Sequence, residues 1–220
     1  MDTMVLVIMA IAACVALEFF GFRAYKRHKV KKESLFTKEQ LAEVYDDLQD
    51  TRSFCLGAKN AYRDLATRAA DSGSLCDAAI LEAMAAGEEA HLKELESFRE
   101  RLHAEPVDVA PMHGADKPLE DALRDMGKQV DEWASGPCAD RAARARLRSY
   151  GDIARMYRRI QEVERLYAGL CLDVAEGAQD GLSDLSRCPG CGIIVSGRRP
   201  AFCTVCTQPG FEFKSVTTSG

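Results

Sequence analysis

The sequence "CPGCGIIVSGRRPAFCTVCTQPGFEF", residues 188–213, carries two CxxC pairs on a strip rich in glycine and proline. Four thiolates from two such pairs can surround one ion as a tetrahedron, which suits zinc or a single iron. The strip is too short for a hydrophobic core, so a bound metal would supply much of its folding free energy. Iron would carry electrons, whereas zinc is redox-silent. The sequence therefore predicts one metal ion, iron or zinc, bound by four cysteines: Cys188, Cys191, Cys203 and Cys206.

The charge of the chain is unevenly distributed. Its 220 residues have a formal net charge of -5, yet residues 23–32, "RAYKRHKVKK", contain six Lys or Arg and no acid. Residues 33–220 hold 23 basic and 32 acidic side chains, a net charge of -9. Nucleic-acid binding requires a basic face. The acidic body therefore argues against nucleic acid as a partner and against a DNA-binding zinc finger.

The N-terminal sequence "MVLVIMAIAACVALEFFGF", residues 4–22, has a single charge, Glu18, and the basic stretch follows it directly. This length spans a hydrocarbon core as a helix. A cleaved signal peptide would carry its basic residues before the apolar run and small residues after it, and neither is present. We expect an uncleaved single-pass anchor, with the body in the cytoplasm by the positive-inside rule. An interfacial helix is the alternative. The chain has nine cysteines, and all but Cys14 lie in the body expected in the cytoplasm, which indicates thiols and metal ligands rather than disulfides.

Apolar residues recur at helical spacing through the middle of the chain. The expected helices cover residues 37–70, 75–102, a segment from about 119 that is interrupted at Gly136-Pro137, and 153–174. Residues 103–118 contain three prolines, which indicates a long crossover. These features predict an all-α four-helix bundle with a long crossover. The expected parts are a transmembrane anchor with its basic stretch at 1–32, the bundle at 33–180 and the metal module at 181–220.

The sequence "GEEAH", residues 87–91, places Glu88 and His91 one helical turn apart, with the same orientation as Met84 and Leu95. That side of the helix is expected to face the core. A Glu-x-x-His motif inside a bundle is the ligand pair of carboxylate-bridged di-iron proteins. The alternative is a core polar network in which the histidine is hydrogen-bonded to a neighbouring acid.

The tail and this helix together resemble the rubrerythrin family. The likeness rests on "CPGCG", "CTVC" and "TQPGFEF" in the tail and on "AAILEAMAAGEEAHLKELESF" in the second helix, and it covers residues 40–213. It implies a ferritin-like bundle followed by a rubredoxin-like module that holds an iron. In this family that iron passes electrons to a di-iron site, which reduces hydrogen peroxide to water. Family members pair so that the tail of one subunit meets the bundle of another, which implies a homodimer.

Two of the family's ligand motifs fall on recognisable positions of this sequence. By resemblance, Glu88 and His91 match the first Glu-x-x-His. The sequence "EVERLY", residues 162–167, matches the second as Glu164 and Tyr167. A tyrosine thus stands where the family has a histidine.

The remaining ligand positions also depart from the family. Alignment of the first helix puts Cys55 where the family has a glutamate, and counting back from Glu164 puts Asp131 in the third helix. Thiolate or phenolate ligands would change the potential and coordination of iron. A di-iron centre, a single metal and an empty site all stay open. The bundle ligands that the resemblance implies are Glu88, His91, Asp131 and Glu164.

The resemblance implies an electron-transfer protein that reduces hydrogen peroxide and receives electrons from a redox donor protein. The anchor expected at residues 4–22 lies outside the resemblance and would place this protein at a membrane. One alternative is a non-enzymatic accessory subunit of a membrane complex, with a degenerate bundle and a structural zinc in the tail. A second alternative is an electron shuttle that keeps iron only in the tail.

Overall fold

The structure is a computed structural model that describes residues 38–102, 117–178 and 184–216. The chain divides into two compact units, residues 1–44 and residues 45–220. The described part of the first unit is the beginning of helix α2. The second unit contains the rest of that helix, the other helices and the cysteine tail.

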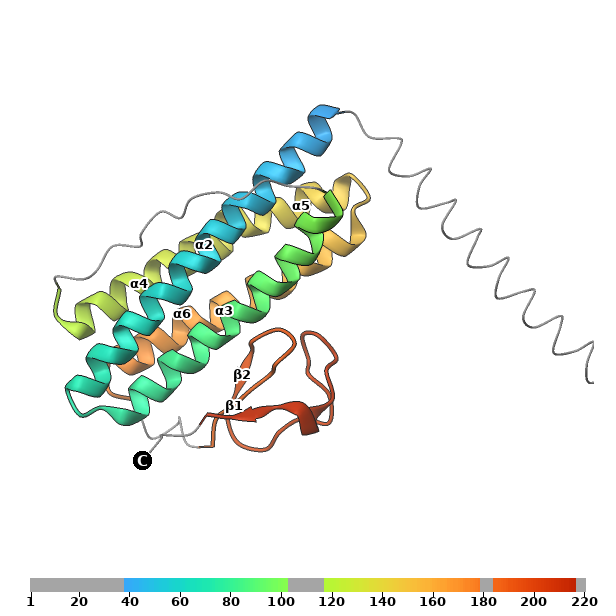
Figure 1. The fold of residues 1–220 in the computed structure, drawn as a ribbon. Helices are drawn as coiled ribbons and strands as arrows, with labels where there is room; N and C mark the ends of the chain where they lie inside the picture. Colours follow the sequence, from blue (N-terminus) through green and yellow to red (C-terminus); the bar gives the residue numbers. More distant parts are fainter. Residues whose placement is uncertain (1–37, 103–116, 179–183, 217–220) are drawn as a thin grey trace, which may run out of the picture. The chain divides into compact units, whose positions relative to one another are not determined.

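Four helical segments run side by side in Figure 1, which confirms the expected four-helix bundle. The third segment consists of α4, a π-helical turn and α5. No residue of the crossover from 103 to 116 is among those described. The bounds are α2 Lys38–Asp71, α3 Leu75–Leu102, α4 Leu119–Trp133, the π turn Ala134–Cys138, α5 Ala139–Leu147 and α6 Gly151–Ala175.

A tight turn joins α2 to α3. Gly73 has a left-handed backbone with φ of 88°, a conformation that glycine adopts without steric cost. The N–H groups of Gly73 and Ser74 bond to the carbonyls of Ala70 and Ala69, each at 2.9 Å. These bonds satisfy the last carbonyls of α2, so the helix ends there and the chain reverses.

The expected interruption at Gly136-Pro137 is a π-helical turn rather than a break. Proline lacks an N–H group and its ring crowds the preceding turn, so an α-helix cannot continue through it without distortion. A π turn inserts one extra residue into the helix and accommodates such a distortion. Helical backbone therefore continues from Leu119 to Leu147, with the residues after the π turn displaced around the axis.

Two sets of side chains hold α2 against the third segment. Phe54 stacks on Trp133 with ring centroids 3.8 Å apart. The guanidinium of Arg141, a residue that is 8% exposed, donates to Thr51 Oγ1 at 3.0 Å and pairs with Asp47 at 3.3 Å. An unpaired buried charge would be strongly unfavourable, so these partners fix the position of α5 on α2.

The tail contains a small antiparallel sheet in the strand order β2-β1-β3. Its apolar side chains belong to the same buried cluster as those of the bundle, including Leu185, Ile194 and Phe213. The tail thus has little core of its own, as expected for so short a segment. The strands are β1 Ser186–Arg187, β2 Ile194–Val195 and β3 Lys214–Ser215.

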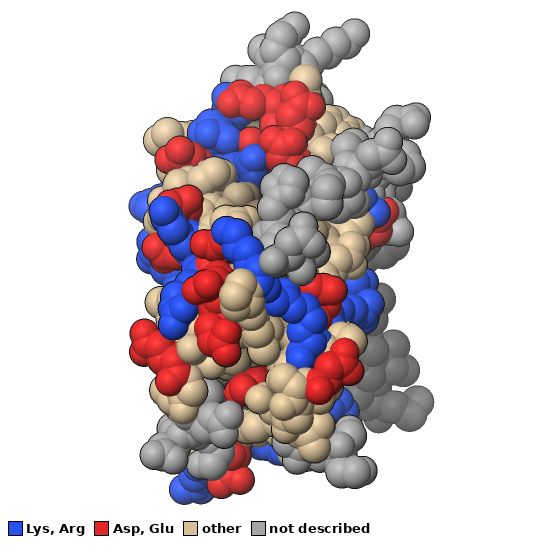
Figure 2. Space-filling model, turned by 90° about the vertical axis from the view of Figure 1, so that its left-hand side faces the viewer, with Lys and Arg blue, Asp and Glu red and all other residues tan. Residues whose placement is uncertain are grey.

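The surface carries both signs of charge. Figure 2 shows acidic and basic side chains interspersed over one face of the molecule. This mixture does not form the continuous basic surface that phosphate binding requires. None of the helices in the described ranges combines the length and apolarity needed to cross a bilayer. The anchor expected at residues 4–22 lies outside the described residues.

Candidate metal centres

The four cysteines of the tail form one cluster, as their spacing predicts. Their sulfur atoms all lie within 4.8 Å of one another. Cys188 Sγ is 3.5 Å from Cys206 Sγ, and Cys191 Sγ is 3.6 Å from Cys203 Sγ. A disulfide would bring two sulfurs to about 2.0 Å. Four sulfurs bonded at about 2.3 Å to one tetrahedral ion would lie about 3.8 Å apart. The cluster therefore has the spacing of a mononuclear metal site.

The two CxxC segments have matching backbone turns. The N–H of Gly192 bonds to the carbonyl of Cys188 at 3.0 Å, and the N–H of Thr207 bonds to that of Cys203 at 2.9 Å. Both residues that follow the second cysteine have a left-handed backbone, with φ of 84° at Gly192 and 64° at Thr207. Each turn thus directs two thiols toward the same point from opposite sides.

Three thiols of the tail, Cys191, Cys203 and Cys206, have a shifted pKa. Burial raises the pKa of Cys206 to about 12, and burial together with the neighbouring cysteines raises that of Cys191. Burial acts in the same direction on Cys203, but backbone N–H groups of Cys206 and Val205 outweigh it and lower the pKa. Cys191 and Cys206 therefore keep their protons until a cation replaces them.

A second cluster lies at the centre of the bundle. Cys55 on α2, Glu88 and His91 on α3, and Glu164 on α6 place their donor atoms within 4.8 Å of one another. Each of these residues is at most 2% exposed. Thiolate sulfur, imidazole nitrogen and carboxylate oxygen are ligands of iron and zinc. Three predicted bundle ligands thus meet, together with the cysteine that the resemblance placed in the first helix.

Both ring nitrogens of His91 have defined neighbours. Nε2 lies 3.0 Å from the carbonyl oxygen of Cys191, and a carbonyl only accepts, so Nε2 carries a proton. Nδ1 lies 3.2 Å from Glu88 Oε2 and 3.2 Å from Glu164 Oε1. A neutral ring with its proton on Nε2 presents the Nδ1 lone pair to the cluster. His91 is therefore oriented to bind a metal through Nδ1.

Three of the four carboxylate oxygens in the cluster lack a hydrogen-bond partner in the protein. Glu88 Oε1 and both oxygens of Glu164 are buried and accept no hydrogen bond; Glu164 Oε1 is near His91 Nδ1 but without hydrogen-bond geometry. Leaving such groups unsatisfied in the core costs about 1–3 kcal/mol each. A bound cation would satisfy all three oxygens, so the donor set fits a metal.

Without a metal, the cluster would retain protons. Burial and the charge of Glu88 raise the pKa of Glu164 to about 8. Burial lowers the pKa of His91, but the adjacent carboxylates of Glu164 and Glu88 outweigh it and raise the pKa to about 10. Burial and the same carboxylates raise the pKa of the Cys55 thiol. A metal ion would take the place of these protons.

Asp131 lies outside the bundle cluster, which corrects the expectation for the third helix. Its side chain is exposed on α4, whereas Val130 and Ala134 are fully buried. Of the described residues from 119 to 147, those that are buried include no carboxylate. Counting back from Glu164 crosses the π turn and the turn after α5, and neither keeps the 3.6-residue period on which the count depends.

Tyr167 connects the bundle to the tail. Its hydroxyl donates to the carbonyl of Gly192 at 2.8 Å, and its fully buried ring packs edge-on against Tyr62. A Cβ at Gly87 would lie 1.7 Å from this hydroxyl, and a Cβ at Gly192 would lie 2.8 Å from Gly87 Cα. The absence of both side chains allows the backbone of the first CxxC turn to rest on α3.

One hydrogen bond joins the two clusters directly. His91, a donor residue of the bundle cluster, bonds to the backbone of Cys191, a donor residue of the tail cluster. Nearby, Arg187 of β1 donates to the carbonyl of Ala86 on α3 at 3.3 Å. Both contacts are made within one chain.

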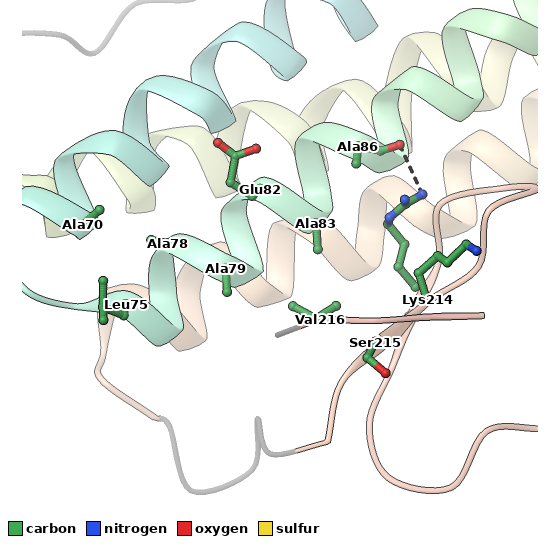
Figure 3. Close-up of a pocket in the computed structure, with 11 residues that line it drawn as sticks. Ala70, Leu75, Ala78, Ala79, Glu82, Ala83, Ala86, Lys214, Ser215 and Val216 are labelled. Carbon is green, nitrogen blue, oxygen red and sulfur yellow. Dashed lines mark hydrogen bonds between the residues drawn. The ribbon is translucent and has the colours of Figure 1, made fainter. Parts of the chain in front are cut away.

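A shallow groove of about 400 Å³ lies beside this contact (Figure 3). Its floor is formed by alanines of α3, and Lys214, Ser215 and Val216 of the tail border it. One carboxylate, Glu82, is among the lining residues, but these include no thiol or imidazole. The groove therefore lacks the donor set that the two clusters have.

The fold is similar to that of nigerythrin. Solved structures of this rubrerythrin-family protein superpose on 78% of the chain and on 86% of their own length. Nigerythrin in its fully reduced, all-ferrous state has a TM-score of 0.68 and 19% sequence identity, and the mixed-valence state has a TM-score of 0.69 and 20% identity. No protein-family model and no curated protein matches the sequence. At this identity the likeness to nigerythrin concerns the fold.

The sequence did not indicate that Tyr167 and Gly87 contact the tail. The tyrosine was expected only as a substitute ligand, whereas its hydroxyl bonds to the tail. The glycine lies directly before Glu88, on a buried helix position where alanine would be more stable in isolation. A glycine at such a position indicates close approach of another backbone, and here that backbone is Gly192.

Proposed function

We propose that this protein is a membrane-anchored, rubrerythrin-like iron protein that transfers electrons from an iron in its tail to a metal in its bundle, where hydrogen peroxide is reduced. The observation that carries the proposal is the 3.0 Å hydrogen bond between His91 and Cys191. This hydrogen bond links His91 of the bundle cluster to Cys191 of the tail cluster, so an electron could pass between the two sites over a short path. Such proximity of the two sites suits electron transfer between them.

The metal proposed for the tail is iron rather than zinc. Both ions accept four thiolates in a tetrahedron, but only iron can cycle by one electron. Similarity to nigerythrin, whose solved states include an all-ferrous and a mixed-valence form, supports this choice. The tail would then deliver electrons singly to the bundle.

A metal bound in the bundle would supply the redox chemistry toward peroxide. The residues of the chain provide its surroundings: His91 is oriented by the tail, and Glu88 and Glu164 offer unpartnered oxygens in a site closed to bulk water. Reduction of one hydrogen peroxide to two waters takes up two electrons and two protons. Because the tail carries one electron at a time, a redox donor protein must reduce it twice per turnover.

The proposed location is the cytoplasmic side of a membrane. The apolar residues 4–22 and the basic residues 23–32 support a single-pass anchor with the body in the cytoplasm. A homodimer is proposed by resemblance to the rubrerythrin family. In such a dimer, the tail of one subunit would make with its partner's bundle the contacts that it makes here within one chain.

A second candidate function is a non-enzymatic accessory subunit of a membrane complex with zinc in the tail. It is favoured by the composition of the third helical segment, which contributes no buried carboxylate among its described residues. It is also favoured by Tyr167, whose hydroxyl donates to the tail backbone at Gly192 and does not face a metal in the bundle. In this case the bundle would act as a scaffold.

Peroxide oxidation of the reduced tail iron tests the proposal. In the full-length, iron-loaded protein the visible thiolate–iron absorption should return on adding peroxide. Glu88→Gln should slow this return at least tenfold, because it weakens the bundle metal while leaving the tail intact. Glu89→Gln is the matched control, since Glu89 is half exposed on the same helix and pairs with Arg63 at 2.7 Å. A colourless zinc protein, or equal rates for both variants, would refute the proposal.

A further inference from the structure

The bundle cluster has the dimensions of a site for one ion. Its four donor atoms lie within 4.8 Å of one another. A single transition-metal ion has bonds of about 2.0–2.3 Å, so it reaches all four with small adjustments. Two ions about 3.5–4 Å apart would need further donors on their outer sides.

In the family's di-iron pattern such donors come from the third helical segment and from the residue one turn after Glu164, and neither supplies one among the described residues. The third segment presents Val130, Ala134 and Cys138 to the core, and Cys138 Sγ is engaged with the carbonyl of Tyr157 at 3.3 Å. Tyr167 follows Glu164 by one turn, but its hydroxyl is bonded to the tail. Neither the third segment nor Tyr167 therefore offers a ligand to a second ion.

The four donors of the cluster are all available to one ion. His91 Nδ1 faces it because Nε2 is held by the tail. Glu88 Oε1 and both oxygens of Glu164 are buried without partners. Cys55 belongs to the same group and is fully buried. Sulfur and nitrogen donors select iron, cobalt or zinc over magnesium and calcium.

We propose that the bundle holds one divalent transition-metal ion, bound by Cys55 Sγ, His91 Nδ1 and the carboxylates of Glu88 and Glu164, in place of a di-iron pair. The proposal rests on the proposed function in one respect, namely that the bundle binds a metal. It adds that the centre is mononuclear and that a thiolate from α2 is one of its ligands.

Cobalt is the probe for this site, because thiolate ligation gives Co²⁺ an intense near-ultraviolet charge-transfer absorption. The full-length protein should bind two Co²⁺ per chain, one in each cluster. Cys55→Ser should reduce the charge-transfer intensity by about one fifth, since one of five ligating thiolates is lost. It should also lower the affinity of the bundle site for Co²⁺ by about tenfold or more, because the loss of a residue that only supports a ligand already lowers metal affinity about 10–100-fold.

Cys138→Ser is the matched control, because this second buried thiol lies outside the cluster and serine can still donate to the carbonyl of Tyr157. It should leave the cobalt count and spectrum unchanged. X-ray absorption of the wild-type protein counts the sulfur ligands of cobalt directly and does not depend on whether a variant folds. It should find about 2.5 sulfur ligands per cobalt rather than 2.

Three ions per chain, or one, would overturn the proposal, as would 2 sulfur ligands per cobalt. Two ions with a spectrum and affinity unaffected by Cys55→Ser would also overturn it, and peroxide turnover could then still stand. Conversely, a Cys55-dependent second ion in a protein that does not react with peroxide would support the mononuclear site and refute the proposed function alone.

Discussion

The contact between Gly87 and the tail predicts that Gly87→Ala destabilises the full-length, metal-loaded protein by about 3 kcal/mol. The added Cβ would lie 1.7 Å from the hydroxyl of Tyr167 and 3.2 Å from Gly192 Cα. The tyrosine is fully buried, so its ring cannot move aside into solvent. Either the ring or the tail must shift.

The magnitude follows from three contributions. Forcing a methyl group into a packed site costs about 1–3 kcal/mol. Loss of the Tyr167–Gly192 hydrogen bond leaves a buried carbonyl unsatisfied, which costs about 1–3 kcal/mol. The higher helix propensity of alanine returns about 1 kcal/mol. The free energy of unfolding should therefore fall by about 3 kcal/mol.

Urea unfolding followed by circular dichroism measures this loss. With a slope of about 2–3 kcal/mol per molar urea, the midpoint should fall by about 1–1.5 M. Gly169→Ala is the control, because Gly169 is an exposed position of α6 with no atom within 4 Å of the added Cβ. That variant should be more stable by about 0.5–1 kcal/mol. If both substitutions stabilise the protein equally, the tail does not rest on α3 and the reasoning is wrong.

Three further predictions concern the hydroxyl, the tail metal and the protons of the bundle site. Tyr167→Phe should cost about 1–2 kcal/mol in urea unfolding and leave the metal count unchanged; loss of an ion would mean that the hydroxyl is a ligand. Cys188→Ser should release one ion per chain and make the tail sensitive to trypsin while the helical circular dichroism is retained; a protease-resistant tail would show that it folds without metal. In the metal-free protein, the folded pKa values of Glu164, about 8, and His91, about 10, lie above their ordinary values of 4.5 and 6.5. The stabilisation from these protons is complete below pH about 4.5 and is lost as pH rises toward 10. The urea midpoint should therefore decrease as pH is raised from about 5 to 9, and Glu164→Gln should make this decrease smaller. A midpoint that increases with pH would contradict this sign.

Much of the site could be predicted from the sequence because its ligands obey short-range spacing. Two CxxC pairs bring four sulfurs together through local turns, and the structure has them in one cluster. Glu88 and His91 share a helix face because they are three residues apart. Cys55 was placed by resemblance, and its thiol lies among the other donors.

The rest of the site depends on long-range geometry that spacing does not encode. Asp131 was placed by counting through a π turn, where the helical period changes and the counted face is lost. The role of Tyr167 depends on where the tail packs, and that contact joins residues 25 positions apart in sequence. The hydrogen bond from His91 to Cys191 spans 100 positions and could not be inferred from either motif alone.

The metal content of the purified full-length protein tests the central claim most directly. Elemental analysis with a visible spectrum should find two metal ions per chain, with thiolate–iron absorption from the tail. One zinc per chain in a colourless protein would contradict the claim that two adjoining centres, one of them an electron carrier, lie within this fold.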